Sequence, residues 1–326
     1  MRKLAIAATL AALIAAACAW SADPAATTQP AETTARITLL HVNDIHGRTM
    51  PYEQGGKSVG GYSRLATLVK RMRAEANDAL LIHAGDELSR GDALTRRTLG
   101  HANVTLMNRI GFDLWTPGNG EFYDGKDNLI ALGREANFPL LTANVKLAHT
   151  GKHLGAEFVV RRLGAVKVAF FGLCHFKTAL PSAKGLKVSD PIETARALVP
   201  ELRKKADIVV AVTHIGYWED LKLAGKVAGI DVIIGGHSHT LLKRGDRVKG
   251  PGGGEVLICQ AGEYMRHLGR IELILARADG RWRIAQARAE VIPIDAKVPE
   301  DQAVKALLAR LSAAAPTRPA GYQNGR

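Results

Sequence analysis

Seven side chains of the kinds that bind metal ions follow apolar runs at five separate places in the sequence. Most of these positions also carry a glycine, which lets the backbone turn sharply. An Asp-x-His pair and a His-x-His pair each place two side chains on the same side of an extended segment, so each pair can hold one ion. The seven donors are Asp44, His46, Asp86, Asn119, His214, His237 and His239.

Seven donors are too many for one ordinary zinc site, which takes four ligands. They can serve two ions if one carboxylate bridges them, and mixed nitrogen and oxygen donors suit Mn, Zn or Fe better than Ca or Mg. A lone histidine is more often structural than a ligand, and we assign no role to the other histidines. The pattern therefore predicts a site for two divalent metal ions.

The runs that precede the donors indicate β-strands, and segments with helical periodicity lie between them. Strands are predicted at residues 37–42, 79–83, 140–144, 158–162, 166–173, 208–212, 232–234, 256–260, 270–276 and 282–291. Helices are predicted at residues 62–74, 92–110, 127–136, 192–205, 219–228 and 300–311. This order predicts an α/β fold with a mixed or second sheet. Because the carboxyl ends of strands in an α/β sheet share one edge, we expect the donors to meet in one crevice.

The motifs, taken in order, resemble the calcineurin-like metallophosphoesterase superfamily and, within it, the catalytic domain of the 5'-nucleotidase family. The matching stretches are residues 41–47 (HVNDIHG), Gly85-Asp86, Gly118-Asn119, Thr213-His214, residues 235–239 (GGHSH), 260–264 (QAGEY) and 268–270 (LGR). The resemblance covers residues 36 to about 301. It implies a four-layer α/β/β/α sandwich with a two-metal centre.

The resemblance also implies a role for each donor. Asp44, His46 and His239 would hold one ion, Asn119, His214 and His237 would hold the other, and Asp86 would bridge the two. The implied reaction is hydrolysis of phosphate esters, as in 5'-nucleotidases, by attack of a hydroxide that bridges the two ions.

One motif departs from the family pattern Asn-His-Glu-Phe-Asp, in which the His, oriented by the Asp, assists the phosphoryl transition state or the leaving group. Here Gly120 occupies the His position, and the acid is displaced by one residue to Asp124. Loss of a general acid costs on the order of 10²–10⁴ in rate. We therefore expect Asn119, Tyr123 and Asp124 to carry catalysis, with Glu121 as a further substitute.

Two other functions remain open at this stage. A thiosulfohydrolase-like activity suits an altered motif, because its leaving group needs no proton. A non-catalytic metal-binding module would follow if the replacement at Gly120 abolishes turnover. A C-terminal domain that grips the nucleobase follows the catalytic domain in 5'-nucleotidases. Here we expect only a helix and tail at residues 299–326 after a phosphoesterase domain at residues 36–298, so base selection is not implied.

The first residues have the features of an export signal. Arg2 and Lys3 precede an Ala/Leu run, and Cys18 lies among small residues. We predict a signal peptide or lipoprotein signal at residues 1–22, a flexible linker at residues 23–35, and a periplasmic or extracellular location with any lipid anchor on Cys18. Cys174 and Cys259 lie in apolar runs and are expected to be buried free thiols, with a disulfide between them as the alternative.

Composition limits the class of protein and of partner. The chain has 326 residues, of which 47% are hydrophobic and 23% charged, and a mean hydropathy of -0.02. These values exclude a disordered chain, a collagen-like fibre and a polytopic membrane protein. Aromatic residues make up only 5%, so we expect no nucleic-acid polymer as a partner. A net charge of +13 suits a small anionic phosphate-ester substrate.

Overall fold

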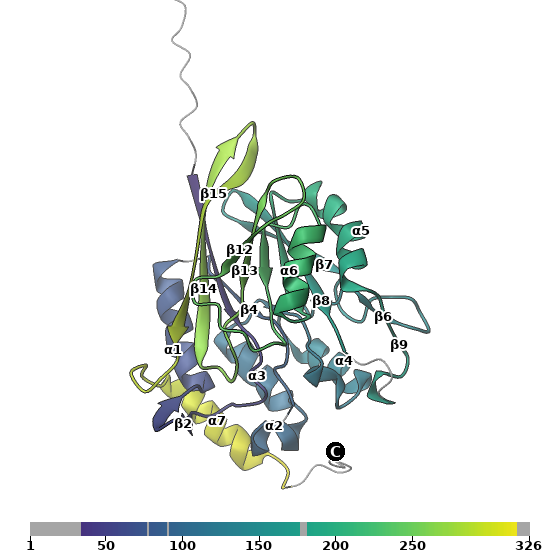
Figure 1. The fold of residues 1–326 in the computed structure, drawn as a ribbon. Helices are drawn as coiled ribbons and strands as arrows, with labels where there is room; N and C mark the ends of the chain where they lie inside the picture. Colours follow the sequence, from purple (N-terminus) through teal and green to yellow (C-terminus); the bar gives the residue numbers. More distant parts are fainter. Residues whose placement is uncertain (1–33, 77, 90, 177–180, 318–326) are drawn as a thin grey trace, which may run out of the picture. The chain divides into compact units, whose positions relative to one another are not determined.

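The computed structural model describes residues 34–76, 78–89, 91–176 and 181–317. Two β-sheets form the centre of this region (Figure 1). The first sheet has the strand order β15-β14-β1-β4-β5 and the second has the order β12-β13-β11-β10-β8-β7. The predicted signal at residues 1–22 and nearly all of the predicted linker lie outside the described residues, as does the end of the predicted tail, residues 318–326.

In the first sheet β1, β4 and β5 are parallel, the long strand β14 is antiparallel to β1, and the long strand β15 is antiparallel to β14. Its strands are β1 (Thr34–Val42), β4 (Leu80–His83), β5 (Leu114–Trp115), β14 (His267–Ala278) and β15 (Arg281–Pro293). In the second sheet four strands are parallel and the two edge strands, β7 and β12, are antiparallel to their neighbours. Its strands are β7 (Phe158–Leu163), β8 (Val166–Cys174), β10 (Ile208–His214), β11 (Val232–Ile234), β12 (Asp246–Lys249) and β13 (Glu255–Cys259).

Alternating side chains of the strands fill two different layers of the core. In β1, Ile37 and Leu39 face the second sheet, whereas Leu40 and Val42 face helices on the opposite side. This period of two is the pattern that a strand buried on both faces requires. Each fully buried aliphatic side chain stabilises the fold by about 1.5–3 kcal/mol.

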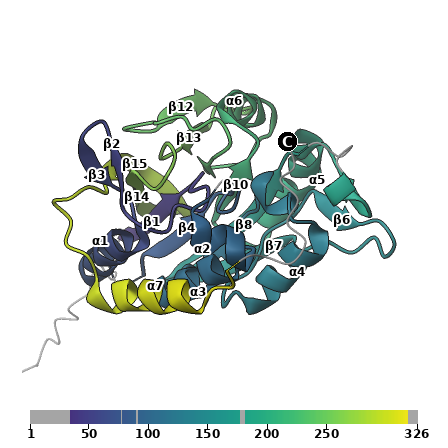
Figure 2. The same cartoon turned by 90° about the horizontal axis from the view of Figure 1, so that it is seen from below.

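Helices cover the outer face of each sheet. The first sheet is covered by α1 (Tyr62–Glu75), α2 (Ala93–Thr98), α3 (His101–Ile110), α4 (Lys126–Glu135) and α7 (Gln302–Ala314). The second sheet is covered by α5 (Pro191–Arg203) and α6 (Tyr217–Lys226). Figure 2 shows α3 and α7 on one side of the sheets and α6 on the other. The order helix, sheet, sheet, helix confirms the predicted four-layer sandwich.

Two predicted elements were wrong in detail. The predicted helix at residues 92–110 is two helices, because Leu99 and Gly100 adopt left-handed backbone angles with φ of 48° and 87°. The predicted strand at residues 140–144 forms only single bridges, at Leu140 and Leu141. Two short antiparallel pairs that were not predicted are β2 (Tyr52–Gln54) with β3 (Lys57–Val59) and β6 (Val145–Leu147) with β9 (Leu186–Val188).

Two further sequence expectations can be compared with the structure. Cys174 and Cys259 are both buried and free, as expected, and no disulfide joins them. Across the described residues, no helix is both long enough and apolar enough to cross a membrane.

Candidate metal centre

The predicted donors meet at the carboxyl ends of strands from both sheets. Asp44 and His46 follow β1, Asp86 follows β4, and His214 is the last residue of β10. His237 and His239 follow β11, while Asn119 follows β5. Main-chain hydrogen bonds join the loops, because the Asp44 N–H donates to the Gly85 carbonyl (2.9 Å) and the His46 N–H donates to the Asp86 carbonyl (2.8 Å). The site thus requires two sheets rather than the single sheet edge expected from the sequence.

The backbone at these donors is strained. Asp44, His46, Asp86, His237 and His239 all have positive φ, between 52° and 78°. Non-glycine residues adopt this region rarely, at a cost of about 1–3 kcal/mol each, and they are concentrated at functional sites. Five such residues in one cluster show that the loops hold these side chains in place at the expense of local stability.

The first tight group is the one that the sequence predicted. The Nε2 atoms of His46 and His239 are 3.0 Å apart, and His239 Nε2 is 3.4 Å from Asp44 Oδ1. Ring nitrogens bind Zn²⁺ at about 2.0–2.1 Å, so two nitrogens on one ion lie about 3 Å apart when the angle at the ion is near 90°. The donors of this group therefore fit one shared cation.

A second tight group consists of Asp44, Asp86 and His214. His214 Nε2 lies 3.3 Å from Asp86 Oδ1 and 3.9 Å from Asp44 Oδ1, yet this fully buried nitrogen forms no hydrogen bond. The other ring nitrogen, Nδ1, is 2.8 Å from the Ala84 carbonyl oxygen, an acceptor that fixes the proton on Nδ1. Nε2 is therefore the ring atom that faces the two carboxylates, and a cation between them would take the place of a proton on Nε2.

Asp86 belongs to the second group, and Asp44 is the donor that both tight groups share. Asp86 Oδ1 lies 3.3 Å from His214 Nε2, whereas its Oδ2 lies 3.8 Å from His46 Nδ1, the ring nitrogen that contacts Ser89. The bridging role of Asp86 stays a prediction. Although burial raises the pKa of Asp86, the imidazoles of His214 and His46 and the Gly120 N–H hold that pKa well below its usual range. Burial lowers the pKa of His214, but Asp86 and Asp44 outweigh burial and raise it to about 10.

Asn119 and His237 contact each other at the exposed side of the cluster. Asn119 Oδ1 is 2.8 Å from His237 Nδ1, and the His237 ring lies edge-on to the His214 ring with centroids 5.1 Å apart. The His237 N–H donates to Asp44 Oδ2 (2.9 Å). The structure therefore brings all seven donors together, although Asn119 and His237 stand beside the two tight groups rather than inside them.

The altered motif has a clear local structure. The Gly120 N–H donates to Asp86 Oδ1 (2.6 Å), and a Cβ atom at Gly120 would lie 3.0 Å from that same oxygen. Glu121 is fully buried and accepts hydrogen bonds from the backbone N–H groups of Asp86 (3.0 Å) and Leu88 (2.8 Å). Burial is the main cause that raises the pKa of Glu121, to about 7. Glu121 therefore holds the backbone of Asp86 and Leu88 in place, and its role as a substitute acid stays a prediction.

The other two predicted catalytic residues differ in their surroundings. Tyr123 is exposed, and its hydroxyl accepts a hydrogen bond from Asn119 Nδ2 (2.8 Å), which places it beside the cluster. Asp124 makes no hydrogen bond or ion pair with any described residue, and partial burial raises its pKa. Of these two residues, Tyr123 is therefore the one that contacts a donor of the site.

A brace formed by residues 260–264 supports the donor loops. Gln260 Oε1 accepts from the Thr240 N–H (2.5 Å) and from the Ser238 hydroxyl (3.0 Å), which holds the loop that carries His237 and His239. The Tyr264 N–H donates to the Asp44 carbonyl (2.7 Å), and Asn43 Nδ2 donates to the Gly262 carbonyl (2.6 Å). The sequence signalled this brace only as part of the family motif and gave no role to its side chains.

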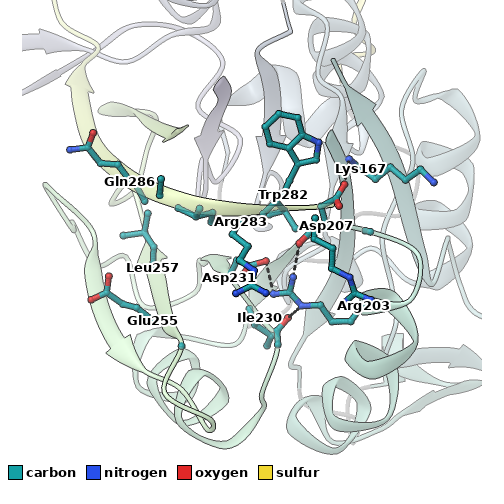
Figure 3. Close-up of a pocket in the computed structure, with 18 of the residues that line it drawn as sticks. Lys167, Arg203, Asp207, Ile230, Asp231, Glu255, Leu257, Trp282, Arg283 and Gln286 are labelled. Carbon is teal, nitrogen blue, oxygen red and sulfur yellow. Dashed lines mark hydrogen bonds and ion pairs between the residues drawn. The ribbon is translucent and has the colours of Figure 1, made fainter. Parts of the chain in front are cut away.

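Two cavities of the described residues lie away from the donors. One, of about 800 Å³, is lined by the residues that precede β10 and β11 together with the start of β15. In it the Arg203 guanidinium pairs with Asp231 (2.6 Å) and donates to the carbonyls of Gly229 and Asp207 (Figure 3). The other, of about 850 Å³, is lined by β14, β15 and the loop before β12. Neither of these two cavities is lined by a candidate donor.

Comparison with known proteins agrees with the donor pattern. Residues 37–241 match the family described as calcineurin-like phosphoesterase. The snake venom 5'-nucleotidase of Gloydius brevicauda is 30% identical over 302 residues, which cover 83% of this chain and 50% of that protein. The chain spans about half the length of the curated relatives that it matches.

Solved structures of related proteins also match the fold of this chain. A 5'-nucleotidase precursor of Thermus thermophilus has a TM-score of 0.77 and 31% identity, and the match covers 85% of this chain and 58% of that one. A sulfate thiohydrolase of the same species has a TM-score of 0.75 at 23% identity, over 85% of this chain and 60% of that one, which shows a shared fold alone. From the converging donors, the four layers and these matches, we conclude that the chain belongs to the calcineurin-like phosphoesterase family.

Proposed function

We propose that this chain is a metal-dependent phosphoesterase that hydrolyses small phosphate esters of the 5'-nucleotidase type, with two divalent ions held by the seven donors. The observation that carries the proposal is the surroundings of Asp44 Oδ1. The Nε2 atoms of His46, His214 and His239 lie 3.8, 3.9 and 3.4 Å from this one oxygen. Three ring nitrogens directed at one buried carboxylate suit metal binding better than a structural hydrogen-bond network.

When bound, divalent ions supply a water of lowered pKa and polarise the phosphoryl oxygens of the substrate. The chain's own residues orient the reacting groups. The Gly120 N–H fixes the Asp86 carboxylate, and Asn119 Nδ2 donates to the Tyr123 hydroxyl. Because that hydroxyl acts as an acceptor from Asn119, its own proton is available, and Tyr123 is our candidate to protonate the leaving group. Asp124 remains a second candidate.

A test of this function measures bound metal and turnover on the full chain. We expect about two equivalents of Mn or Zn per chain, and metal-dependent turnover of an aryl phosphate, whose leaving group needs little protonation, above that of 5'-nucleotides. Asp86→Asn should remove activity, whereas Asp279→Asn, in the exposed turn between β14 and β15, should retain it. Two bound ions without turnover of any of these esters would instead favour the non-catalytic metal-binding module, and a chain that binds no added ion would refute the proposal.

We further propose that the protein is exported through residues 1–22, since a charged start, an apolar run and small residues occur in the order of a signal peptide. Cell fractionation of the full chain should place it outside the cytoplasm. A variant lacking residues 1–22 should stay in the cytoplasm, and Cys18→Ser should change the membrane-bound fraction only if a lipid is attached there.

A further inference from the structure

One ligand histidine has a carboxylate partner of its own. His239 Nδ1 lies 2.6 Å from Glu263 Oε2, and Glu263 Oε1 accepts a hydrogen bond from Arg266 Nη2 (2.8 Å). Glu263 comes from the brace of residues 260–264, and His239 comes from the loop after β11. The pair therefore joins two loops that are distant from each other along the chain.

The contact dictates which nitrogen of His239 carries the proton. An ionised carboxylate only accepts hydrogen bonds, so Nδ1 must carry a hydrogen, and Nε2 is the ring atom that remains to bind a cation once any proton there is displaced. Nε2 is the atom that lies 3.0 Å from His46 Nε2 and 3.4 Å from Asp44 Oδ1. A ring in the opposite tautomer would present an N–H to that group instead of a lone pair.

The rings of His46 and His214, the other two histidines of the tight groups, are oriented by weaker partners. His214 Nδ1 is 2.8 Å from the neutral carbonyl of Ala84, and His46 Nδ1 is 3.0 Å from the Ser89 hydroxyl, which can donate or accept. The only one of these three Nδ1 atoms that faces a carboxylate at hydrogen-bond distance is that of His239. This difference makes His239 the ring whose tautomer is most firmly fixed.

The backbone around Glu263 keeps the carboxylate in position. The next residue, Tyr264, has a φ of 56°, its N–H donates to the Asp44 carbonyl (2.7 Å), and its ring packs against His46 and His239 with centroids 5.5 and 6.2 Å away. Arg266 holds the far oxygen of Glu263, so the side chain has little freedom to rotate away.

We propose that Glu263, held by Arg266, is a positioning residue that fixes the Nδ1–H tautomer of His239 and thereby strengthens cation binding by Asp44, His46 and His239. This inference rests on the proposed function for its metal, although the tautomer itself is a property of the metal-free chain. Carboxylate partners of metal-binding histidines typically contribute about 10- to 100-fold in metal affinity. We therefore expect Glu263→Ala to weaken Zn²⁺ binding at this group by about that factor.

The experiment has two independent readouts on the full chain. Histidine ring ¹⁵N shifts of the metal-free protein should show His239 as the Nδ1–H tautomer in wild type and a mixture of tautomers in Glu263→Ala, with His214 unchanged. Titration of Zn²⁺ against a competing chelator should then show the loss of affinity. Glu263→Asp should restore part of both effects, Arg266→Gln should give a smaller loss, and Glu201→Gln, on the exposed face of α5, serves as the matched control.

Failure of this inference and failure of the proposed function can be told apart. If wild type binds no Zn²⁺, the function fails, while the tautomer measurement still decides whether Glu263 orients the ring. An unchanged His239 tautomer in Glu263→Ala, or an affinity within about twofold of wild type, would overturn the inference. Should Glu263→Ala not fold, the same two criteria apply to Glu263→Gln, which keeps the shape and removes the charge.

Discussion

Two charged regions lie at opposite ends of the strands of the second sheet. At the amino ends, the partly buried carboxylate of the cavity around Arg203 is paired, since Asp231 pairs with Arg203 and also accepts from the Val209 N–H (2.8 Å). At the carboxyl ends, His214 Nε2 is buried without a hydrogen bond, and two histidine nitrogens face each other.

The two regions differ in how many buried polar groups lack a partner and in how many residues have a strained backbone. A buried polar group without a partner costs about 1–3 kcal/mol, and a strained residue costs a similar amount. Both costs accumulate at the metal centre, whereas the amino-end cavity shows ordinary ion pairing. A buried, unpaired ligand atom together with five donors of positive φ therefore distinguishes the candidate centre from this cavity.

The largest expected effect separates the two regions directly. Asp86→Asn should lower kcat/KM by about 10³-fold, because the carboxylate that we propose to bridge the two ions would contribute several kcal/mol of metal and transition-state stabilisation. Asp231→Asn should leave activity per folded molecule unchanged and reduce the free energy of unfolding by about 1–3 kcal/mol. Steady-state kinetics and urea unfolding of both variants check this. A loss of stability without loss of activity in Asp86→Asn would reverse the assignment of the two regions.

His41 is a case that could break the rule, because its buried Nδ1 also lacks a hydrogen bond although no donor cluster surrounds it. Burial lowers the pKa of His41 from 6.5 to about 4. The unfolded chain therefore binds the proton between pH 6.5 and 4 while the folded chain does not, so stability present above pH 6.5 is lost as the pH falls. The loss should reach about 3 kcal/mol by a pH of about 4.

Urea unfolding of wild type and His41→Gln across this pH range measures that loss. The acid-side slope should be shallower in the variant, while the difference between the two proteins should be constant above a pH of about 7. Equal slopes in the two proteins would show that a group other than His41 causes the loss of stability at low pH. Binding of a metal ion by His41 would show that an unpaired nitrogen alone does mark a site.

A bound metal ion should stabilise the folded chain through the candidate metal centre and not through the cavity around Arg203. A cation that binds only the folded chain, at about 100 times its dissociation constant, adds about 2.7 kcal/mol to the free energy of unfolding. Thermal unfolding with excess Mn²⁺ and with a chelator should show this difference in wild type and in Asp231→Asn, but not in Asp86→Asn. Equal stabilisation of all three proteins would place the ion elsewhere.

A smaller effect is expected at the altered motif. The methyl group of Gly120→Ala would lie about 3.0 Å from Asp86 Oδ1 and Ser89 Oγ, closer than ordinary contact allows. Displacement of the Asp86 carboxylate by a few tenths of an ångström should weaken metal binding and lower kcat/KM by about 10-fold. Gly120→His has the same crowded Cβ and should also lose activity. A higher kcat/KM for Gly120→His would mean that the missing acid limits the rate and that the loop can move to make room for the side chain.

Much of the site could be predicted from the sequence, because each donor lies within two residues of a glycine or another donor at the end of an apolar run. Asp86 and His214 are examples, and the structure brings both to the same place. The division of the strands between two sheets could not be derived from periodicity, since β1 and β10 are apolar on both faces in the same way. The two-sheet arrangement was predicted only from the resemblance to the family.

What could not be predicted depends on contacts between distant residues. The break at Leu99 and Gly100 occurs where the Leu88 side chain fills the space that a Cβ at Gly100 would need, 2.5 Å away. The role of Glu263 depends on a left-handed turn at Tyr264 and on a histidine in another loop. Neither leaves a periodic signal in the residues nearby.

The separation between His46 and His239 has a consequence for how the protein matures. The two rings come within 3.0 Å although 193 positions separate them along the chain. A growing polypeptide cannot complete the ion-binding pair until the loop after β11 has been synthesised and both sheets have docked. We therefore expect the proposed centre to take up metal late, in whichever compartment the finished chain folds.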